Sequence, residues 1–145
     1  MCYISAKTHF SFVILTLYIS PVIYVSATLE PYDVYVVNNL PDNTSPLIIH
    51  CKSKNNDLGI QHLFQNSGFH WHFRMNFWDS TLYYCGFLWA QKNITFTVFD
   101  SGLADHECGR KAKDDICYWS VQSDGFYIAN ILNPPAGSLK KKQTW

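Results

Sequence analysis

The sequence predicts an all-β protein, a small antiparallel β-sandwich of about seven strands with two disulfides. Three observations lead to this fold class. Short segments rich in β-branched and aromatic residues follow one another, separated by clusters of turn-forming residues. No segment after residue 27 has the 3.6-residue period of an amphipathic helix. Removal of a predicted leader leaves four cysteines, an even number that suits two disulfides.

Residues 1–27 have the three-part pattern of a secretory signal peptide. Lys7 supplies a positive charge, residues 10–25 form an apolar run interrupted by Pro21, and residues 25–27 offer small side chains for cleavage. The alternative is an uncleaved membrane anchor, but the apolar run is shorter than the roughly 20 residues of a spanning helix. We therefore expect a cleaved signal peptide and one secreted, extracellular domain over residues 28–145, with no membrane insertion after cleavage.

The charge balance and the composition exclude some classes of protein. Lys7 is the only charged residue of the leader, so cleavage leaves ten basic and 11 acidic side chains. This balance argues against a nucleic-acid binder, whose affinity depends on clustered Lys and Arg. The one basic cluster, at residues 140–142, is interpreted as a solvated tail. Aromatic residues make up 17% of the chain against 15% charged residues, which favours a core built from large rings.

Seven segments fulfil the criteria for strands. In chain order they are residues 32–37, 47–51, 68–75, 81–89, 94–100, 116–121 and 125–129. The first segment ends at the turn formers of residues 38–43 and the second at the polar stretch 52–59. In the fourth segment, Gly86 is a candidate β-bulge.

The third segment has the clearest alternation. Aromatic residues at positions 69, 71 and 73 alternate with His70, His72 and Arg74. This period of two is the signal of a half-buried strand, with its rings toward the core and its polar side chains toward solvent.

The connections after the fourth segment are also recognisable. Residues 90–93 form the turn between the fourth and fifth segments, and residues 122–124 join the last two segments as a hairpin. Residues 101–115 are polar and contain Gly102 and Gly109, so we expect a loop there.

Several short motifs occur together in a characteristic order. Residues 36–40 are followed by residues 49–54 and then by Asp57-Leu58-Gly59. This order resembles the N-x-L … H-C-x-S-x-D-D-L-G signature of the plant self-incompatibility S-protein family, which includes the stigmatic S-proteins of poppy and many S-protein homologues. The later landmarks agree: Phe73, Phe77, residues 81–85, Phe87-x-Trp89, Cys108, Cys117-x-Trp119 and residues 124–127.

The resemblance covers residues 34–145, with all four cysteines in family order. The chain departs from the pattern at Asn55 and Asn56, where acidic residues are common, and at Tyr84, where Phe or Trp is often found. If the acidic residues of the family contact a partner, the change to Asn55 and Asn56 would affect recognition of that partner.

The resemblance implies a small secreted β-sandwich that acts as a signalling ligand without catalysis. In the poppy case it implies binding to a pollen membrane receptor, calcium signalling and death of incompatible pollen. We therefore expect a plant cell-surface membrane receptor as the partner, no nucleic acid and no cofactor. Two alternatives stay open: a defence or cell-wall and glycan-binding protein, and a secreted hydrolase with an unrecognised site.

The four cysteines allow three pairings, and sequence alone does not choose among them. The strand assignment favours Cys51–Cys117, because both residues lie within strands. It also favours Cys85–Cys108, because Cys108 lies on the loop that leaves the partner strand of Cys85. The rival is a metal site, but no C-x2-C pair is present, so we expect no bound metal. His70 and His72 are interpreted as exposed polar residues of a strand.

The sequence holds no recognisable catalytic constellation. A nucleophile elbow and a glycine-rich phosphate loop are both missing from it. All four cysteines are expected in disulfides, which leaves no reactive thiolate. His50 is interpreted as a satisfied, partly buried histidine. We therefore expect no enzymatic activity.

Two sequons fall in predicted turns of this secreted protein. They are Asn43-Thr44-Ser45 and Asn93-Ile94-Thr95, so Asn43 and Asn93 are candidate glycosylation sites.

Partner recognition is expected on loops that a rigid sandwich presents. The candidate loops are residues 52–59, 76–80 and 101–115. In the first loop Lys52 and Lys54 are near Asp57. In the second, Trp78 is a candidate exposed anchor, with a core position as the alternative. The candidate partner-binding residues are therefore Lys52, Lys54, Asp57 and Trp78.

Overall fold

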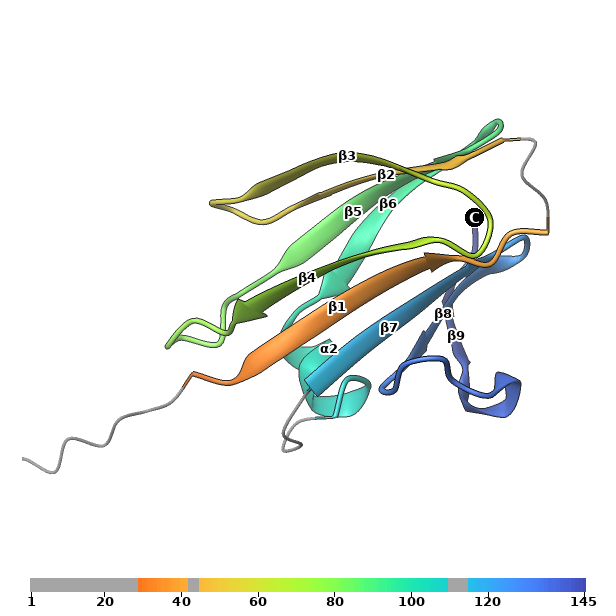
Figure 1. Ribbon diagram of the computed structural model, residues 1–145. Helices are drawn as coiled ribbons and strands as arrows, with labels where there is room; N and C mark the ends of the chain where they lie inside the picture. Colours follow the sequence, from red (N-terminus) through yellow and green to blue (C-terminus); the bar gives the residue numbers. More distant parts are fainter. Residues whose placement is uncertain (1–28, 42–44, 110–114) are drawn as a thin grey trace, which may run out of the picture.

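The computed structural model describes residues 29–41, 45–109 and 115–145, and it confirms the predicted β-sandwich. Two sheets face each other, as Figure 1 shows. The described residues form nine strands rather than about seven. The predicted leader at residues 1–27 and the sequon residue Asn43 lie outside the described residues. Within those ranges, no helix has the length and apolar character needed to cross a membrane.

The first sheet has five strands in the order β4–β1–β7–β8–β9. Its strands are β1 (Pro31–Asn38), β4 (Gly68–Arg74), β7 (Asp115–Gln122), β8 (Gly125–Ala129) and β9 (Lys140–Gln143). Neighbouring strands are antiparallel except for β1 and β7, which run parallel.

The second sheet has four antiparallel strands in the order β3–β2–β5–β6. They are β2 (Leu47–Lys52), β3 (Asp57–Leu63), β5 (Tyr83–Trp89) and β6 (Lys92–Phe99).

Aromatic rings from both sheets fill the space between them. Phe126 of β8 lies 4.7 Å from Phe87 and 4.8 Å from Phe96, measured between ring centroids. Trp119 of β7 packs on Phe96 at 5.4 Å and donates its indole N–H to the carbonyl of Val98, 2.9 Å away. Each buried ring contributes a few kcal/mol, and the indole bond fixes the two sheets relative to each other.

The seven predicted strands are confirmed, and the structure adds β3 and β9. The first three residues of β3 belong to the stretch 52–59 that was expected to be polar, and no strand was predicted for residues 60–63. Strand β3 lies at the edge of its sheet and has few buried side chains. Strand β9 contains the lysines that were expected to form a solvated tail. They form a strand and not a tail, and their side chains stay exposed. Lys140 and Lys142 both contact the carboxylate of Glu107, and Lys141 lies 3.3 Å from that of Asp124.

A short helix, α2 (Ser101–His106), occupies part of the expected loop 101–115. The N–H of Leu103 donates to the Asp100 side chain at 2.8 Å, which caps its first turn. Six residues are too few to produce a recognisable helical period in the sequence. A single turn of 3-10 helix, η1 (Ala136–Ser138), precedes β9.

All four cysteines form disulfides, but the favoured pairing is wrong. The bonds are Cys51–Cys85 and Cys108–Cys117. Cys51 and Cys85 lie directly opposite each other on the adjacent strands β2 and β5, with Cα atoms 4.0 Å apart. Cys117 lies in the other sheet, and α2 brings Cys108 back to it. The sequence separations of 34 and 9 residues correspond to about 3.8 and about 2.6 kcal/mol of chain-entropy stabilisation.

The pairing predicts which peptides stay linked when trypsin digests the non-reduced protein. We expect residues 28–52 linked to 75–92, and residues 93–110 linked to 114–140, in mass spectra that collapse to single peptides on reduction. A link between residues 28–52 and 114–140 would instead support the pairing that the sequence favoured.

The contacts of Lys140 and Lys142 with Glu107, called the Glu107 clamp here, predict that the free energy of unfolding depends on pH. Hydrogen bonds from Lys142 and then Lys140 hold the pKa of Glu107 below its ordinary value. A carboxylate with a lowered pKa stabilises the fold above its unfolded-state pKa, and this stabilisation disappears as the pH falls through the folded-state value. We expect Glu107→Gln to lower the free energy of unfolding by roughly 1 kcal/mol at about pH 6, with a smaller difference near pH 3. Urea unfolding across this range measures it, and a difference that stays constant with pH would contradict the clamp.

Candidate functional site

Two of the three candidate loops come together at one end of the sandwich. The β2–β3 hairpin loop (residues 53–56) and the β4–β5 connection (residues 75–82) lie at the same end in Figure 1. They line a pocket of about 510 Å³, together with the end of β4 and the start of β5. The structure thus builds a concave surface from segments that are about 20 residues apart in the sequence.

Asp57 organises the base of the β2–β3 hairpin. Its Oδ1 accepts the N–H of Gly59 at 2.9 Å and lies 2.6 Å from Nε2 of His50, while Nζ of Lys52 lies 3.5 Å from Oδ2. The hydrogen bond from Gly59 and then that from His50 hold the pKa of Asp57 below its ordinary value. The interpretation of His50 as a satisfied, partly buried residue is confirmed.

The hairpin geometry explains why Asp57, Leu58 and Gly59 occur together. The register between β2 and β3 shifts at this point, and Gly59 has φ +77°, in the left-handed region that favours glycine. The shift allows Leu58 to pack against the core while Asp57 stays at the surface. These residues therefore set the geometry of the hairpin that forms one wall of the pocket.

The β4–β5 connection presents two aromatic rings to solvent. Residues 76–79 form a turn in which the N–H of Asp79 donates to the carbonyl of Asn76 at 3.1 Å. Phe77 and Trp78 occupy its central positions with 69% and 81% of their surface exposed. Their rings contact each other edge to face at 5.1 Å. The alternative core position for Trp78 is wrong, and its role in binding stays a prediction.

Asn76 makes this turn rigid. Its side chain donates to Oγ of Ser80 and accepts the N–H of Ser80, both at 2.8 Å. Its own N–H donates to Oγ1 of Thr81 at 2.9 Å. With these bonds made, the aromatic pair is held out from the protein on an ordered support.

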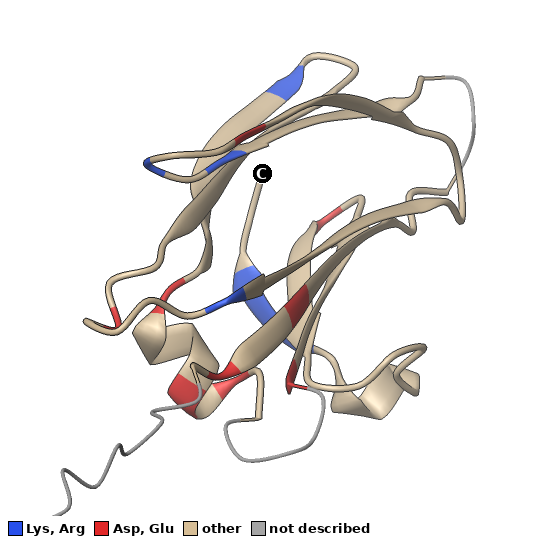
Figure 2. Ribbon diagram, turned by 60° about the vertical axis from the view of Figure 1, so that its left-hand side comes forward, with Lys and Arg blue, Asp and Glu red and all other residues tan. Residues whose placement is uncertain are grey.

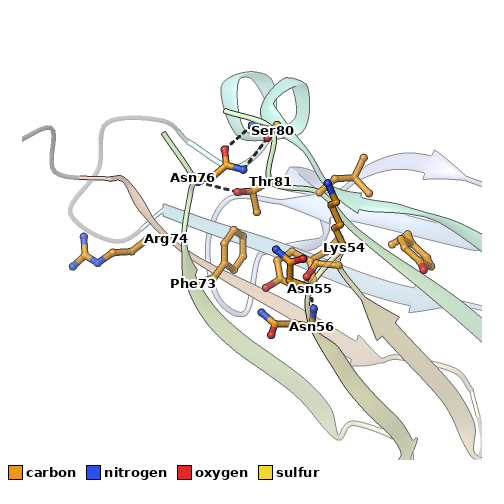
Figure 3. Close-up of a pocket in the computed structure, with 12 residues that line it drawn as sticks. Lys54, Asn55, Asn56, Phe73, Arg74, Asn76, Ser80 and Thr81 are labelled. Carbon is orange, nitrogen blue, oxygen red and sulfur yellow. Dashed lines mark hydrogen bonds between the residues drawn. The ribbon is translucent and has the colours of Figure 1, made fainter. Parts of the chain in front are cut away.

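The pocket has an aromatic floor and a polar rim. The rings of Phe73 and Tyr83 both line it and pack on each other at 4.8 Å between ring centroids. Figure 3 shows Lys54, Asn55 and Asn56 of the hairpin across from Phe73. In the described part of the chain, Lys54 has no ion-pair partner.

Arg74 lines the rim but does not enter the pocket. Its Nη1 donates to the carbonyl of Leu29 at 2.8 Å, and Figure 3 shows its side chain directed away from the other labelled residues. The positive charge in the pocket therefore comes from Lys54. Among the described residues, the other basic side chains lie on β2, β4, β6 and β9, with three consecutive lysines on β9, where Figure 2 shows a continuous blue stretch.

The four predicted partner-binding residues lie at this end of the molecule, in different roles. Lys52 and Asp57 pair with each other, and Lys54 lines the pocket. Trp78 stands on the turn beside it. The pocket was not predicted, and Phe77, named only as a family landmark within the candidate loop 76–80, was not predicted to bind a partner. Two consecutive aromatic residues in a polar turn are a usable signal for it. Of the third loop, residues 110–114 lie outside the described residues.

The other histidines of interest lie on the outer face of the five-stranded sheet. His70 stacks on Tyr35 at 4.9 Å between ring centroids, and Nδ1 of His72 lies 3.2 Å from Oδ1 of Asp33. Within the described ranges, no group of three or more His, Cys, Asp or Glu residues could hold a metal ion.

Known proteins share both the sequence pattern and the fold. The sequence profile of plant self-incompatibility protein S1 matches residues 33–145. S-protein homolog 24 of Arabidopsis thaliana is 33% identical over 120 residues, covering 81% of this chain and 76% of that protein. S-protein homolog 5 of the same plant is 38% identical over 80 residues, covering 55% of this chain and 58% of that protein.

A solved structure also resembles this fold. It represents self-incompatibility protein homologues, described as a widespread family of small, highly stable, secreted proteins from plants. The TM-score is 0.58 at 17% identity, and the match covers 81% of this chain and 96% of that one. The extracellular location predicted from residues 1–27 agrees with that description. The sequence matches show that the chain belongs to the plant self-incompatibility S-protein family.

Proposed function

We propose that this protein is a secreted ligand that binds a plant cell-surface receptor and catalyses no reaction. The binding surface is the end formed by the β2–β3 hairpin loop and the β4–β5 turn. The observation that carries this proposal is the exposed pair Phe77 and Trp78, held on a hydrogen-bonded turn beside a pocket.

Solvent-exposed aromatic pairs are characteristic of binding sites. Trp is among the residues most enriched at the energetic centres of protein interfaces, where large rings enter pockets of the partner. The bonds around Asn76 order the turn in advance, so binding loses little conformational entropy there. Most of the free energy gained by burying the two rings would therefore appear as affinity.

The pocket beside the turn supplies complementary polar contacts. Lys54 offers a positive charge, and the carboxamides of Asn55 and Asn56 add hydrogen-bonding groups without adding negative charge. Acidic residues are common at these two positions in the family pattern. The chemistry of this rim therefore suits an acidic receptor segment that also offers an apolar recess for Trp78.

The scaffold under this end is rigid. The Cys51–Cys85 bond joins β2 to β5 just before these strands reach the two walls of the pocket. A surface fixed in this way binds as a preformed shape.

The one histidine–carboxylate pair of the hairpin supports structure rather than catalysis. Asp57 is occupied by the Gly59 N–H, His50 and Lys52. The nearby Ser53 hydroxyl accepts the N–H of Asn56 at 3.1 Å and belongs to the hairpin turn. This arrangement supports a binding protein over a hydrolase.

Replacing Trp78 tests the binding surface. We expect labelled, oxidised protein to bind intact cells of the source plant, pollen included, in a saturable and protease-sensitive manner. Trp78→Ala should weaken this binding by at least about tenfold, the scale of an interface hot spot. Competition binding with unlabelled protein measures the change.

Phe64→Ala is the matched control, because Phe64 is 58% exposed and lies on the β3–β4 connection at the other end. It should bind like the unaltered protein. Equal losses for the two variants, or none for Trp78→Ala, would contradict the proposed surface. If wall glycans, and not the unlabelled protein, displace the labelled protein from cells, the receptor proposal is rejected and the wall-binding alternative is favoured.

A glycan at Asn93 would leave this end free. The structure places Asn93 in β6 rather than in a turn, and its side chain is exposed. Asn93 pairs with Leu88, which pairs with Ile48, so the three share the outer face of the four-stranded sheet. Leu88 is 40% exposed there. A glycan on Asn93 would cover this apolar face and not the loop end.

We therefore expect the peptide 93–110 of the plant-expressed protein to carry an N-glycan that peptide N-glycosidase A removes, as mass spectrometry would show. Asn93→Gln and Thr95→Ala should both lose the glycan and self-associate at lower protein concentration. An unmodified peptide from unaltered protein would overturn this expectation.

A further inference from the structure

A second pocket, of about 300 Å³, lies on the outer face of the five-stranded sheet. Tyr118, Ser120 and Gln122 of β7 line it. They alternate with Cys117, Trp119 and Val121, which belong to the core, so they point away from the other sheet. Asn39, which follows β1, completes this wall. Because Pro31 at the start of β1 pairs with Arg74, Asn39 lies at the end opposite to the β4–β5 turn.

The connection between β8 and β9 forms the other wall. Asn133, with φ 48°, is followed by Pro134, Ala136 and Leu139, which all line the pocket. This connection explains why two outward-facing residues of β7 are nearly inaccessible. Tyr118 is 6% exposed and Ser120 is 1% exposed.

Hydrogen bonds orient the polar side chains of the pocket. The Ser120 hydroxyl donates to Oδ1 of Asn39 at 2.7 Å and accepts Nε2 of Gln122 at 3.1 Å. None of the lining side chains is an acid, a lysine, an arginine or a histidine. Burial raises the pKa of Tyr118, which keeps its phenol neutral.

Several polar groups of this pocket stay available. Among the described residues, Nδ2 of Asn39, Oε1 of Gln122 and the hydroxyl of Tyr118 have no hydrogen-bond partner. They offer a donor, an acceptor and a group that can do both. Although the Tyr118 residue as a whole is 6% exposed, its hydroxyl is not among the fully buried polar atoms of the described residues that lack a partner, so it is open to water or a ligand in the pocket.

We propose that this pocket binds a neutral pyranose unit of a glycan. A sugar offers hydroxyls for Asn39, Gln122 and Tyr118, and its C–H faces can pack on Pro134 and Leu139. A charged ligand would lose its hydration without meeting an opposite charge. The volume is at the lower end of the range for small-molecule sites, so one sugar unit fits and the rest of the chain extends into solvent.

Side-chain amide NMR signals test this assignment. The probes are cello-, manno- and xylo-oligosaccharides, with oligogalacturonate as the charged comparison and an N-acetylated dipeptide amide as the peptide comparison. We expect one neutral oligosaccharide to shift the signals of Asn39, Gln122 and Asn133. The signals of Asn55 and Asn56 in the other pocket should not move.

Variants separate the pocket from general surface contacts. Tyr118→Phe keeps the ring, and Gln122→Met keeps the length of the side chain. Each variant should raise the dissociation constant for that oligosaccharide by about tenfold. Asn55→Ala should leave it unchanged, and the melting temperatures confirm that all three variants are folded.

Three outcomes would overturn the proposal. One is that no neutral oligosaccharide shifts the pocket signals at about 10 mM, well above the Kd of a weak millimolar site. Another is that Tyr118→Phe and Gln122→Met both bind the sugar as the unaltered protein does. The last is stronger binding of the dipeptide amide than of any sugar, which would assign the pocket to peptides. None of these results depends on whether a receptor binds the β4–β5 turn.

Discussion

Contact between the aromatic inner faces of the two sheets holds the rest of the structure in place. Phe126 packs against both Phe87 and Phe96, and Trp119 reaches across to the carbonyl of Val98. Trp145 packs on Phe126 at 4.6 Å, so the same ring contacts also hold the segment after β9. Because these rings fix both sheets, the connections at the ends of the strands are presented at defined positions. The loop end and the second pocket both depend on this contact.

The disulfides and ion pairs secure segments near the ends of strands. Cys51–Cys85 secures the strands that lead into the first pocket, and Cys108–Cys117 secures the segment after α2. Glu107 and two lysines attach β9 to that same segment. The protein therefore combines a rigid body with two surfaces of different chemistry. One surface is aromatic and positively charged, and the other is uncharged and rich in amides.

The sequence was sufficient for the fold class, because alternation in segments such as β4 reports burial directly. The sequence did not predict β3, because an edge strand has few buried side chains and so lacks a clear alternation. It also did not predict β9, because three exposed lysines give no strand signal, and their pairing with Glu107 and Asp124 depends on the fold. The disulfide pairing depends on which strands are neighbours, and the spacing of cysteines does not contain that information. The pocket was also unpredictable, because Lys54 and Tyr83 meet only through the register of β2 and β5.

Photo-crosslinking from position 78 identifies what the exposed ring contacts on a living cell. Benzoylphenylalanine would replace Trp78 in one sample and Phe64, the exposed aromatic residue at the opposite end, in another. A binding surface at the β4–β5 turn predicts that only position 78 forms a covalent adduct with a membrane protein, and that excess unlabelled protein abolishes the adduct. Adducts formed equally from both positions, or none from position 78 on cells that bind the protein, would contradict it.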